Sequence, residues 1–340
     1  MSFCHASSGS ASSTSKFRNA ATSAGCVQSE FGDRNLQAIL LQQQHRQQHG
    51  STQQTNNGTS SVRYCMNLVE KNDHENYLCT LLLDNAHRRH AFALRAFNVE
   101  VAKCSANVSE DHIAKMRLKF WFDSIEKCYA KEKTYVADQP VLRELKNAID
   151  SFQLNKVYLK RLVNARDRAP NEPFVTIKDL ETYAEQTYSS LLYLLVQLTG
   201  VKDMNVDHAA SHLGKAQGIV TLLRSVPYTK RSQALNIPQE VLIKNGVSQE
   251  RVLRSKANDK GVEDCIFEVA TAAHQHLEMA RNLSDKVPKE VRKLFLPAVA
   301  IERYLERLRL ANFNLTHQSC LQRDSMLPFS LYMRNLRGKF

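Results

Sequence analysis

The sequence lacks the features that mark zinc-binding, secreted or membrane-spanning proteins. Its 8 cysteines are scattered and form no C-x-x-C pair, which argues against a cysteine-based zinc site. The uncharged stretch at 189–201 is much shorter than the roughly 20 residues that span a bilayer. No secretory apolar segment opens the chain. We therefore expect reduced cysteines, several of them buried in a core, in a reducing compartment.

Acidic residues are absent before Glu30, whereas Lys16 and Arg18 stand among serines and alanines. This composition is typical of a mitochondrial presequence, although two bases and a poor amphipathic pattern also suit a generic disordered leader. Residues 1–60 are rich in Ser, Ala, Gln and Asn and show no apolar periodicity. We predict that they form a disordered leader consisting of a presequence and a Gln-rich linker.

The formal net charge is +12, from 46 basic and 34 acidic residues. Such an excess favours anionic partners, either phospholipid headgroups or nucleic acid. The sequence has no zinc knuckle, no interleaved aromatic and basic signature and no other nucleic-acid reading motif, so a lipid surface is favoured and nucleic acid is not.

Helical periodicity dominates the chain after Asn72, which predicts an all-α fold with one helical domain at 61–315 and a C-terminal extension at 316–340. The extension mixes apolar and basic residues, so it could contact a membrane or pack as a short helix.

Several helix boundaries follow from local signals in the sequence. Ser109 and Thr176 are candidate helix caps, the latter in a capping box with Asp179, and Pro140 suits a first helical turn. The single Trp121 is predicted to lie in the core. Later helices are expected at about 207–224, 238–245, 248–257, 259–283 and 288–310, with a kink at Pro297 inside the last.

Residues 212–238 read HLGKAQGIVTLLRSVPYTKRSQALNIP. The run resembles the second diphosphate-binding segment of the phytoene/squalene synthase family. This chain keeps the framework residues of that segment at Leu213, Gly214, Ala216, Leu223 and Arg224. In that family a D-x-x-x-D pair stands where this chain has Ser225 and Thr229. A further run at 87–129 resembles the first acidic segment of the same family, and there the acidic pair would fall at Asn98 and Ala102.

Two carboxylates four residues apart share one face of a helix and can hold magnesium against a diphosphate. Neutral side chains supply no charge to offset a divalent ion, and Glu100 lies about 200 degrees away from Asn98 around the helix, at about 100 degrees per residue. These losses predict a noncatalytic member of the prenyltransferase family, with no catalytic residue, no metal and no cofactor assigned.

Two other clusters have metal-like spacing. Asp203 and Asp207 repeat the D-x-x-x-D pattern, but they follow the break at Gly200 and are interpreted as a solvated loop with Asp207 as a helix N-cap. His208 and His212 have i, i+4 spacing; without a third ligand, ordinary histidines on a helix surface are the favoured interpretation.

The resemblance implies an isoprenoid synthase-like helical bundle with a central cavity between the two formerly acidic helices. It further implies a noncatalytic branch that helps to assemble respiratory complex I, the NADH:ubiquinone oxidoreductase. The implied role is early in the biogenesis of the membrane arm, at the matrix side of the mitochondrial inner membrane, with complex I subunits or assembly intermediates as partners.

Two alternatives accompany this interpretation. A lipid or isoprenoid carrier would use cations beside the old motifs to attract an anionic head group, although the same residues could form ordinary ion pairs. An active prenyl diphosphate transferase is opposed by all four lost acids. The candidate cations are Arg95, Lys103, Arg224, Lys230 and Arg231.

Overall fold

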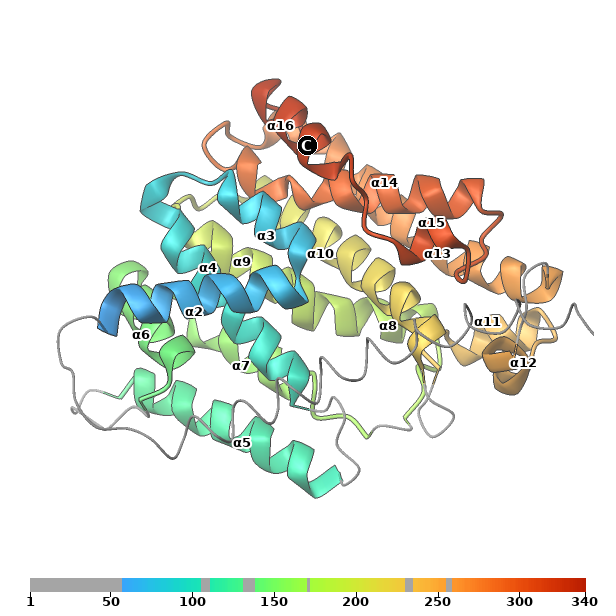
Figure 1. Ribbon diagram of the computed structural model, residues 1–340, viewed down its shortest axis with the longest axis horizontal. Helices are drawn as coiled ribbons and strands as arrows, with labels where there is room; N and C mark the ends of the chain where they lie inside the picture. The colour runs from blue at the N-terminus through green and yellow to red at the C-terminus, as the bar shows by residue number, and fades with distance from the viewer. Residues whose placement is uncertain (1–56, 105–110, 131–137, 170–171, 230–234, 255–258) are drawn as a thin grey trace, which may run out of the picture. The chain divides into compact units, whose positions relative to one another are not determined.

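In the computed structural model, which describes residues 57–104, 111–130, 138–169, 172–229, 235–254 and 259–340, the secondary structure of these residues is entirely helical (Figure 1). The all-α prediction is therefore confirmed. The first half of the described chain contains α2 (Asn57–Asn72), α3 (His74–Leu81), α4 (Asn85–Lys103), α5 (Asp111–Cys128), α6 (Pro140–Phe152), α7 (Lys156–Asn164), α8 (Ile177–Ala184), a π-helical turn η1 (Glu185–Ser189) and α9 (Ser190–Gln197).

The second half contains three long helices and several short ones. They are α10 (Met204–Ser225), η2 (Val226–Tyr228), α11 (Gln239–Lys244), α12 (Gln249–Arg254), α13 (Lys260–Asn282), η3 (Ser284–Lys286), η4 (Arg292–Phe295), α14 (Pro297–Leu310), α15 (Gln318–Leu321) and α16 (Leu327–Leu336). Figure 1 shows α10 near the middle of this body, with α14 and α16 along one edge and α5 at the other.

Most predicted helix starts are found, because they depend on short-range hydrogen bonds. Thr176 and Asp179 form a reciprocal capping box on α8, and Pro140 occupies the first turn of α6. The start of α10 was predicted wrongly. Its N-cap is Asp203, whose carboxylate accepts a hydrogen bond from the backbone N–H of Asn205 at 2.7 Å, and Asp207 lies in the first turn. The candidate cap Ser109 lies outside the described residues.

The prediction of a kink at Pro297 is also wrong. Pro297 is the first residue of α14, and the preceding segment is the separate short helix η4. A proline at the first helical position leaves no hydrogen bond unmade, since that N–H has no partner within the helix. The expected helix at 288–310 is therefore two elements.

Helix α10 packs along α13 and also against α8, η1 and α9. Two glycines, Gly214 and Gly218, face this second group. A Cβ atom at Gly214 would lie 2.5 Å from the Cα of Ser189, and one at Gly218 would lie 2.4 Å from the Cβ of Ala184. The helices can be this close only because both positions lack a side chain.

The helical segment that begins after Thr176 is interrupted, between α8 and α9, by the π turn η1, which meets α10. Polar contacts join the two elements there. The hydroxyl of Ser189 donates to the carbonyl of Ser211 at 2.9 Å, and that of Ser211 donates to the carboxylate of Glu185 at 2.7 Å. Such π bulges are frequent at functional sites, and this one lies beside the cavity described below.

One continuous core runs through the helices, and Trp121 belongs to it at 5 % exposure, as predicted. The six described cysteines are all buried and unpaired, which agrees with the expected reduced state: Cys65, Cys79, Cys104, Cys128, Cys265 and Cys320. The other two cysteines lie outside the described residues.

The predicted leader at 1–60 lies outside the described residues except for 57–60, which belong to α2. Residues 316–340, separated in the sequence as an extension, pack as α15 and α16 within the same compact unit as the rest, 57–340. Among the described helices, none is both long and apolar enough to cross a membrane.

Candidate functional site

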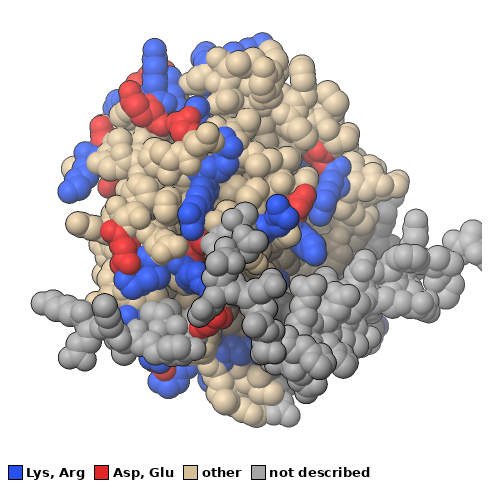
Figure 2. All heavy atoms as spheres, turned by 60° about the vertical axis from the view of Figure 1, so that its left-hand side comes forward, with Lys and Arg blue, Asp and Glu red and all other residues tan. Residues whose placement is uncertain are grey.

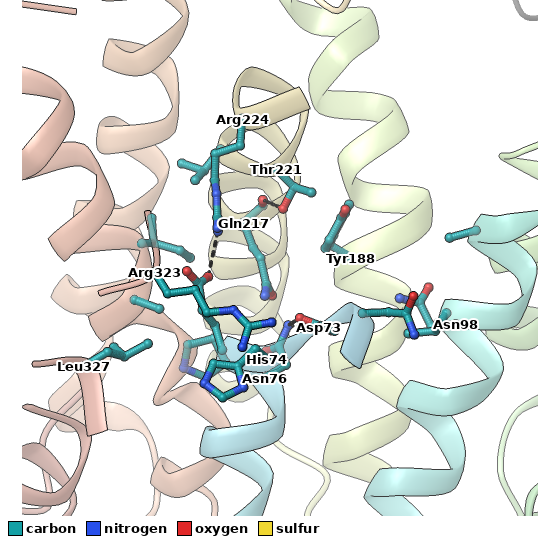
Figure 3. A pocket seen from close by; sticks show the side chains of 18 of the residues that line it. Asp73, His74, Asn76, Asn98, Tyr188, Gln217, Thr221, Arg224, Arg323 and Leu327 are labelled. Carbon is teal, nitrogen blue, oxygen red and sulfur yellow. Dashed lines mark hydrogen bonds and ion pairs between the residues drawn. The ribbon is translucent and has the colours of Figure 1, made fainter. Parts of the chain in front are cut away.

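A cavity of about 530 Å³ opens between the two helices that resemble the acidic helices of the synthases. From α4 it is lined by Asn98, Val99, Ala102 and Lys103, and from α10 by Gln217, Val220, Thr221 and Arg224. Figure 3 shows Asn98 and Leu327 on opposite sides of it, with Gln217, Thr221 and Arg224 along α10 between them. The predicted central cavity is therefore present, and residues of α2, α3, η1, α14 and the segment before α16 also line it.

Asn98, the first of the predicted degenerate metal positions, is held by an arginine. The Arg166 Nη2 donates to the Oδ1 of Asn98 at 2.6 Å, and the Nη1 donates to the carbonyl of Leu162 at 2.5 Å. Asn98 is 8 % exposed and Arg166 is 7 % exposed. A guanidinium group thus occupies a position next to Asn98, where its charge would repel a divalent cation.

The other three predicted degenerate metal positions, Ala102, Ser225 and Thr229, line a second hollow of about 350 Å³. The hydroxyl of Ser225 donates to the carbonyl of Leu222 at 2.6 Å and accepts from the Nδ2 of Asn236 at 2.8 Å. The hydroxyl of Thr229 donates weakly to the backbone carbonyl of Ser225, at 3.3 Å. Both hydroxyls are therefore engaged locally.

The residues at these positions do not fit the magnesium ions that a synthase-like site implies. Magnesium takes oxygen ligands, chiefly carboxylates and phosphates. Asn98, Ala102, Ser225 and Thr229 contribute no carboxylate, and Arg166 adds a positive charge beside them. Within the described ranges, no group of three or more His, Cys, Asp or Glu residues has a geometry that could hold a metal ion.

The carboxylates that do line the first cavity are already engaged. Glu75 forms an ion pair with the Nη1 of Arg224 at 2.8 Å, and Asp324 accepts hydrogen bonds from the Nε and Nη2 of Arg303, at 2.5 and 2.9 Å. Asp73 accepts from the Nδ2 of Asn76 at 2.9 Å. The acids of the wall are thus used to hold neighbouring side chains.

Three cations that line the cavity have no ion pair with any described residue: Lys71, Lys103 and Arg323. Burial lowers the pKa of Lys103, while Glu100 partly opposes this shift and Lys71 adds to it. The cavity therefore presents more unpaired positive than negative charge, which favours an anionic group inside it.

The predicted binding residues do not all line the cavity. Lys103 and Arg224 line the cavity, although Arg224 is committed to its interhelical pair with Glu75. Arg95 is 2 % exposed within α4 and is not a lining residue. Its Nε atom has no hydrogen-bond partner, and burial lowers the pKa of its guanidinium. Lys230 and Arg231 lie outside the described residues.

Sequence reasoning missed Arg166, Lys71 and Arg323. Arg166 lies 68 positions from Asn98 in the sequence, and Arg323 reaches the cavity from the C-terminal segment. No local spacing joins these residues to the degenerate motifs, so only the packing of the helices places them together.

The predicted histidine pair is part of a longer chain that includes a residue from α13. The Nε2 atoms of His208 and His212 are 3.1 Å apart, and the Nδ1 of His212 lies 2.8 Å from the Nδ1 of His276. The Nε2 of His276 lies 3.2 Å from Glu181. Burial, followed by the charges of His276 and His208, lowers the pKa of His212 to about 4, so a neutral His212 is expected near neutral pH.

A model of the squalene/phytoene synthase family matches residues 69–329, which is most of the chain. The chain belongs to the squalene/phytoene synthase family. Among its relatives, a Drosophila melanogaster protein named NADH dehydrogenase (ubiquinone) complex I, assembly factor 6 homolog is 62% identical over 282 residues, covering 82% of this chain and 84% of the relative. The Rattus norvegicus protein named assembly factor 6 is 42% identical over 278 residues, covering 82% of each chain.

Solved structures with the same family fold include enzymes. A dehydrosqualene synthase in complex with a ligand matches with a TM-score of 0.70 and 18% identity, covering 82% of this chain and 96% of that one. Squalene synthase HpnC from Alicyclobacillus acidocaldarius matches with a TM-score of 0.65 and 19% identity, covering 77% and 97%. At this level of identity the likeness establishes the isoprenoid synthase-like fold, which the sequence predicted.

Proposed function

We propose that this family member is a noncatalytic assembly factor for mitochondrial respiratory complex I. The noncatalytic part is supported by the 2.6 Å hydrogen bond from Arg166 to Asn98, which sets a cation beside a position where the family resemblance predicts a lost metal-binding acid. The assembly role is supported by similarity to the insect and mammalian proteins named as complex I assembly factor 6.

The proposed place of action is the matrix side of the inner membrane, with the protein bound peripherally. Two features support it: a net charge of +12, and the leader composition before Glu30. The proposed partners are complex I subunits or assembly intermediates, early in the biogenesis of the membrane arm. A helical body with a cationic cavity could hold a lipid or an apolar segment while such a subunit is assembled.

The assembly role is tested by depleting the protein from cells and resolving complex I intermediates on native gels. We expect loss of mature complex I, accumulation of incomplete membrane-arm intermediates, and rescue by re-expression of the chain. Normal complex I levels after depletion would overturn the assembly role. Proximity labelling in mitochondria tests the placement, since labelling confined to other compartments would exclude it.

The noncatalytic role has a separate test. The purified chain is incubated with magnesium and farnesyl or geranylgeranyl diphosphate, with an active dehydrosqualene synthase as the positive control. We expect no prenyl product from this chain. Product formed by the chain, and lost on Arg224→Met, would show that catalysis persists.

A lipid or isoprenoid carrier is the second candidate, and it is compatible with assembly. The unpaired Lys71, Lys103 and Arg323 in the cavity favour it, since they could bind a phosphate head group without a metal. Native mass spectrometry of the purified chain tests for a retained lipid, and a prenyl monophosphate titration tests for saturable binding. Lys103→Gln should weaken that binding, and absence of both signals would reject the carrier.

A further inference from the structure

Helix α16 presents an apolar stripe that no described element covers. Met326, Phe329, Tyr332 and Leu336 are between 53 and 62 % exposed. At about 100 degrees per residue, these four positions fall within one sector of roughly 120 degrees. An uncovered stripe of this kind on a helix indicates a docking surface.

The opposite face of α16 fastens the helix to the body. Leu327 and Leu331 are 3 and 1 % exposed and pack in a cluster with Leu296, Val299 and other residues. Beyond the helix, the ring of Phe340 stacks on that of Phe295 with centroids 4.9 Å apart. The stripe is therefore held outward on a fixed support.

The charges around the stripe are positive. Arg323, Arg337 and Lys339 are exposed, and none forms an ion pair with a described residue. The one acid in 316–340 is Asp324, whose side chain is 8 % exposed and bound by Arg303. Figure 2 shows a broad uncharged area at the top of the molecule, the level of α16 in Figure 1, with basic side chains along its upper edge.

We propose that the stripe on α16, with its three flanking cations, docks the protein onto an anionic phospholipid bilayer. Aromatic and aliphatic side chains on one face, beside exposed basic residues, are the pattern of helices that lie in the headgroup region. Phe and Tyr rings enter the interface, and each cation attracts anionic headgroups.

The charge of this surface favours an anionic bilayer over a protein as the occupant, because Arg323, Arg337 and Lys339 are exposed and have no ion pair with a described residue. Leu327 lines the 530 Å³ cavity from the face of α16 opposite the stripe, and Arg323, in the segment before the helix, also lines it. Both surfaces select the same anionic headgroup chemistry. This inference rests on the peripheral placement proposed above and assigns it to particular residues.

The test is flotation of the full purified chain with vesicles of phosphatidylcholine alone and of phosphatidylcholine with phosphatidylserine. We expect binding to the anionic vesicles that weakens with added salt. The double variant Phe329→Ser/Tyr332→Ser should bind at least tenfold more weakly. Arg337→Gln/Lys339→Gln should lose on the order of fivefold per cation, and only on anionic vesicles.

The matched control is Met204→Ser/Ile243→Ser, which removes side chains that are 86 and 79 % exposed elsewhere. It should bind like the unmodified chain, and all variants should melt at an unchanged temperature, since the altered side chains are exposed. Failure of the unmodified chain to float, or full binding by the stripe variant, would overturn the proposal. If the stripe variant still binds vesicles but no longer captures complex I intermediates, the stripe contacts a protein instead. Because flotation uses no complex I, its failure leaves the assembly role open to its own test.

Discussion

Replacing Gly214 by alanine should destabilise the fold at the contact that sets the wall of the cavity. The new Cβ would lie 2.3 Å from the Oγ of Ser189 and 2.5 Å from both its Cα and its backbone nitrogen. Carbon atoms pack at about 3.5 Å, so α10 and η1 must move apart by about 1 Å. No change of rotamer relieves this, because two of the three atoms belong to the backbone.

The magnitude follows from two opposing effects. Alanine is favoured over glycine inside a helix by about 1 kcal/mol. Overpacking a core typically costs about 1–3 kcal/mol, and occasionally more when the backbone must shift. We expect the second effect at its upper end, which leaves a net loss of about 2 kcal/mol in the free energy of unfolding. For a domain of this size that corresponds to a fall of roughly 3–4 °C in melting temperature.

The assay is urea unfolding followed by far-ultraviolet circular dichroism, together with thermal melting. Gly261→Ala is the matched control, because its Cβ would meet side-chain atoms and no backbone atom, at 3.0 Å from the Cγ2 of Val247 and 3.4 Å from the Nη2 of Arg251. It should change the unfolding free energy by less than about 1 kcal/mol. If Gly214→Ala were as stable as the unmodified chain, the close approach at η1 would not exist in solution.

Three further predictions concern charged groups. Burial alone would raise the pKa of Glu144, but hydrogen bonds from Arg89 and Ser61 outweigh burial and lower the pKa. The ionised Glu144 therefore stabilises the fold above pH 4.5, and this stabilisation is lost as the pH falls through the lower pKa of the folded state. Glu144→Gln should flatten acid unfolding curves in that pH range. The pKa of His212 is lowered to about 4, so stability should fall as pH drops from about 6.5 towards 4, and His212→Asn should remove that slope in the same melts. Arg224→Met breaks a partly exposed ion pair with a glutamate on α3, so urea unfolding should show a fall of less than about 1 kcal/mol in the free energy of unfolding. A larger fall would mean that the pair is better shielded from water than its exposure indicates.

The local parts of the fold could be predicted because their causes lie within a few residues. The capping box at Thr176 and the proline start at Pro140 depend on neighbours three or fewer positions away. The two failures, Asp207 as a cap and Pro297 as a kink, arose where two adjacent residues or segments could play the same role. Sequence patterns place such boundaries only to within a few residues.

The contacts of the candidate site could not be predicted from the sequence. The predicted losses at Asn98, Ala102, Ser225 and Thr229 came from comparing those positions with the motifs that surround them. The hydrogen bond from Arg166 to Asn98 was not visible, because Arg166 lies 68 positions away, in the turn after α7. Likewise, Arg95 is as basic in sequence as Lys103, yet only one of them lines the cavity.

By itself, the sequence determined the helical class and the family frame, because periodicity and motif spacing are properties of neighbouring residues. Only the tertiary structure decided which charges meet. It paired Arg224 with Glu75, set Arg166 against Asn98, joined His276 to the histidines of α10, and turned one face of α16 outward. Electrostatic contacts depend on distance in space, and distant segments acquire that distance only when the helices pack.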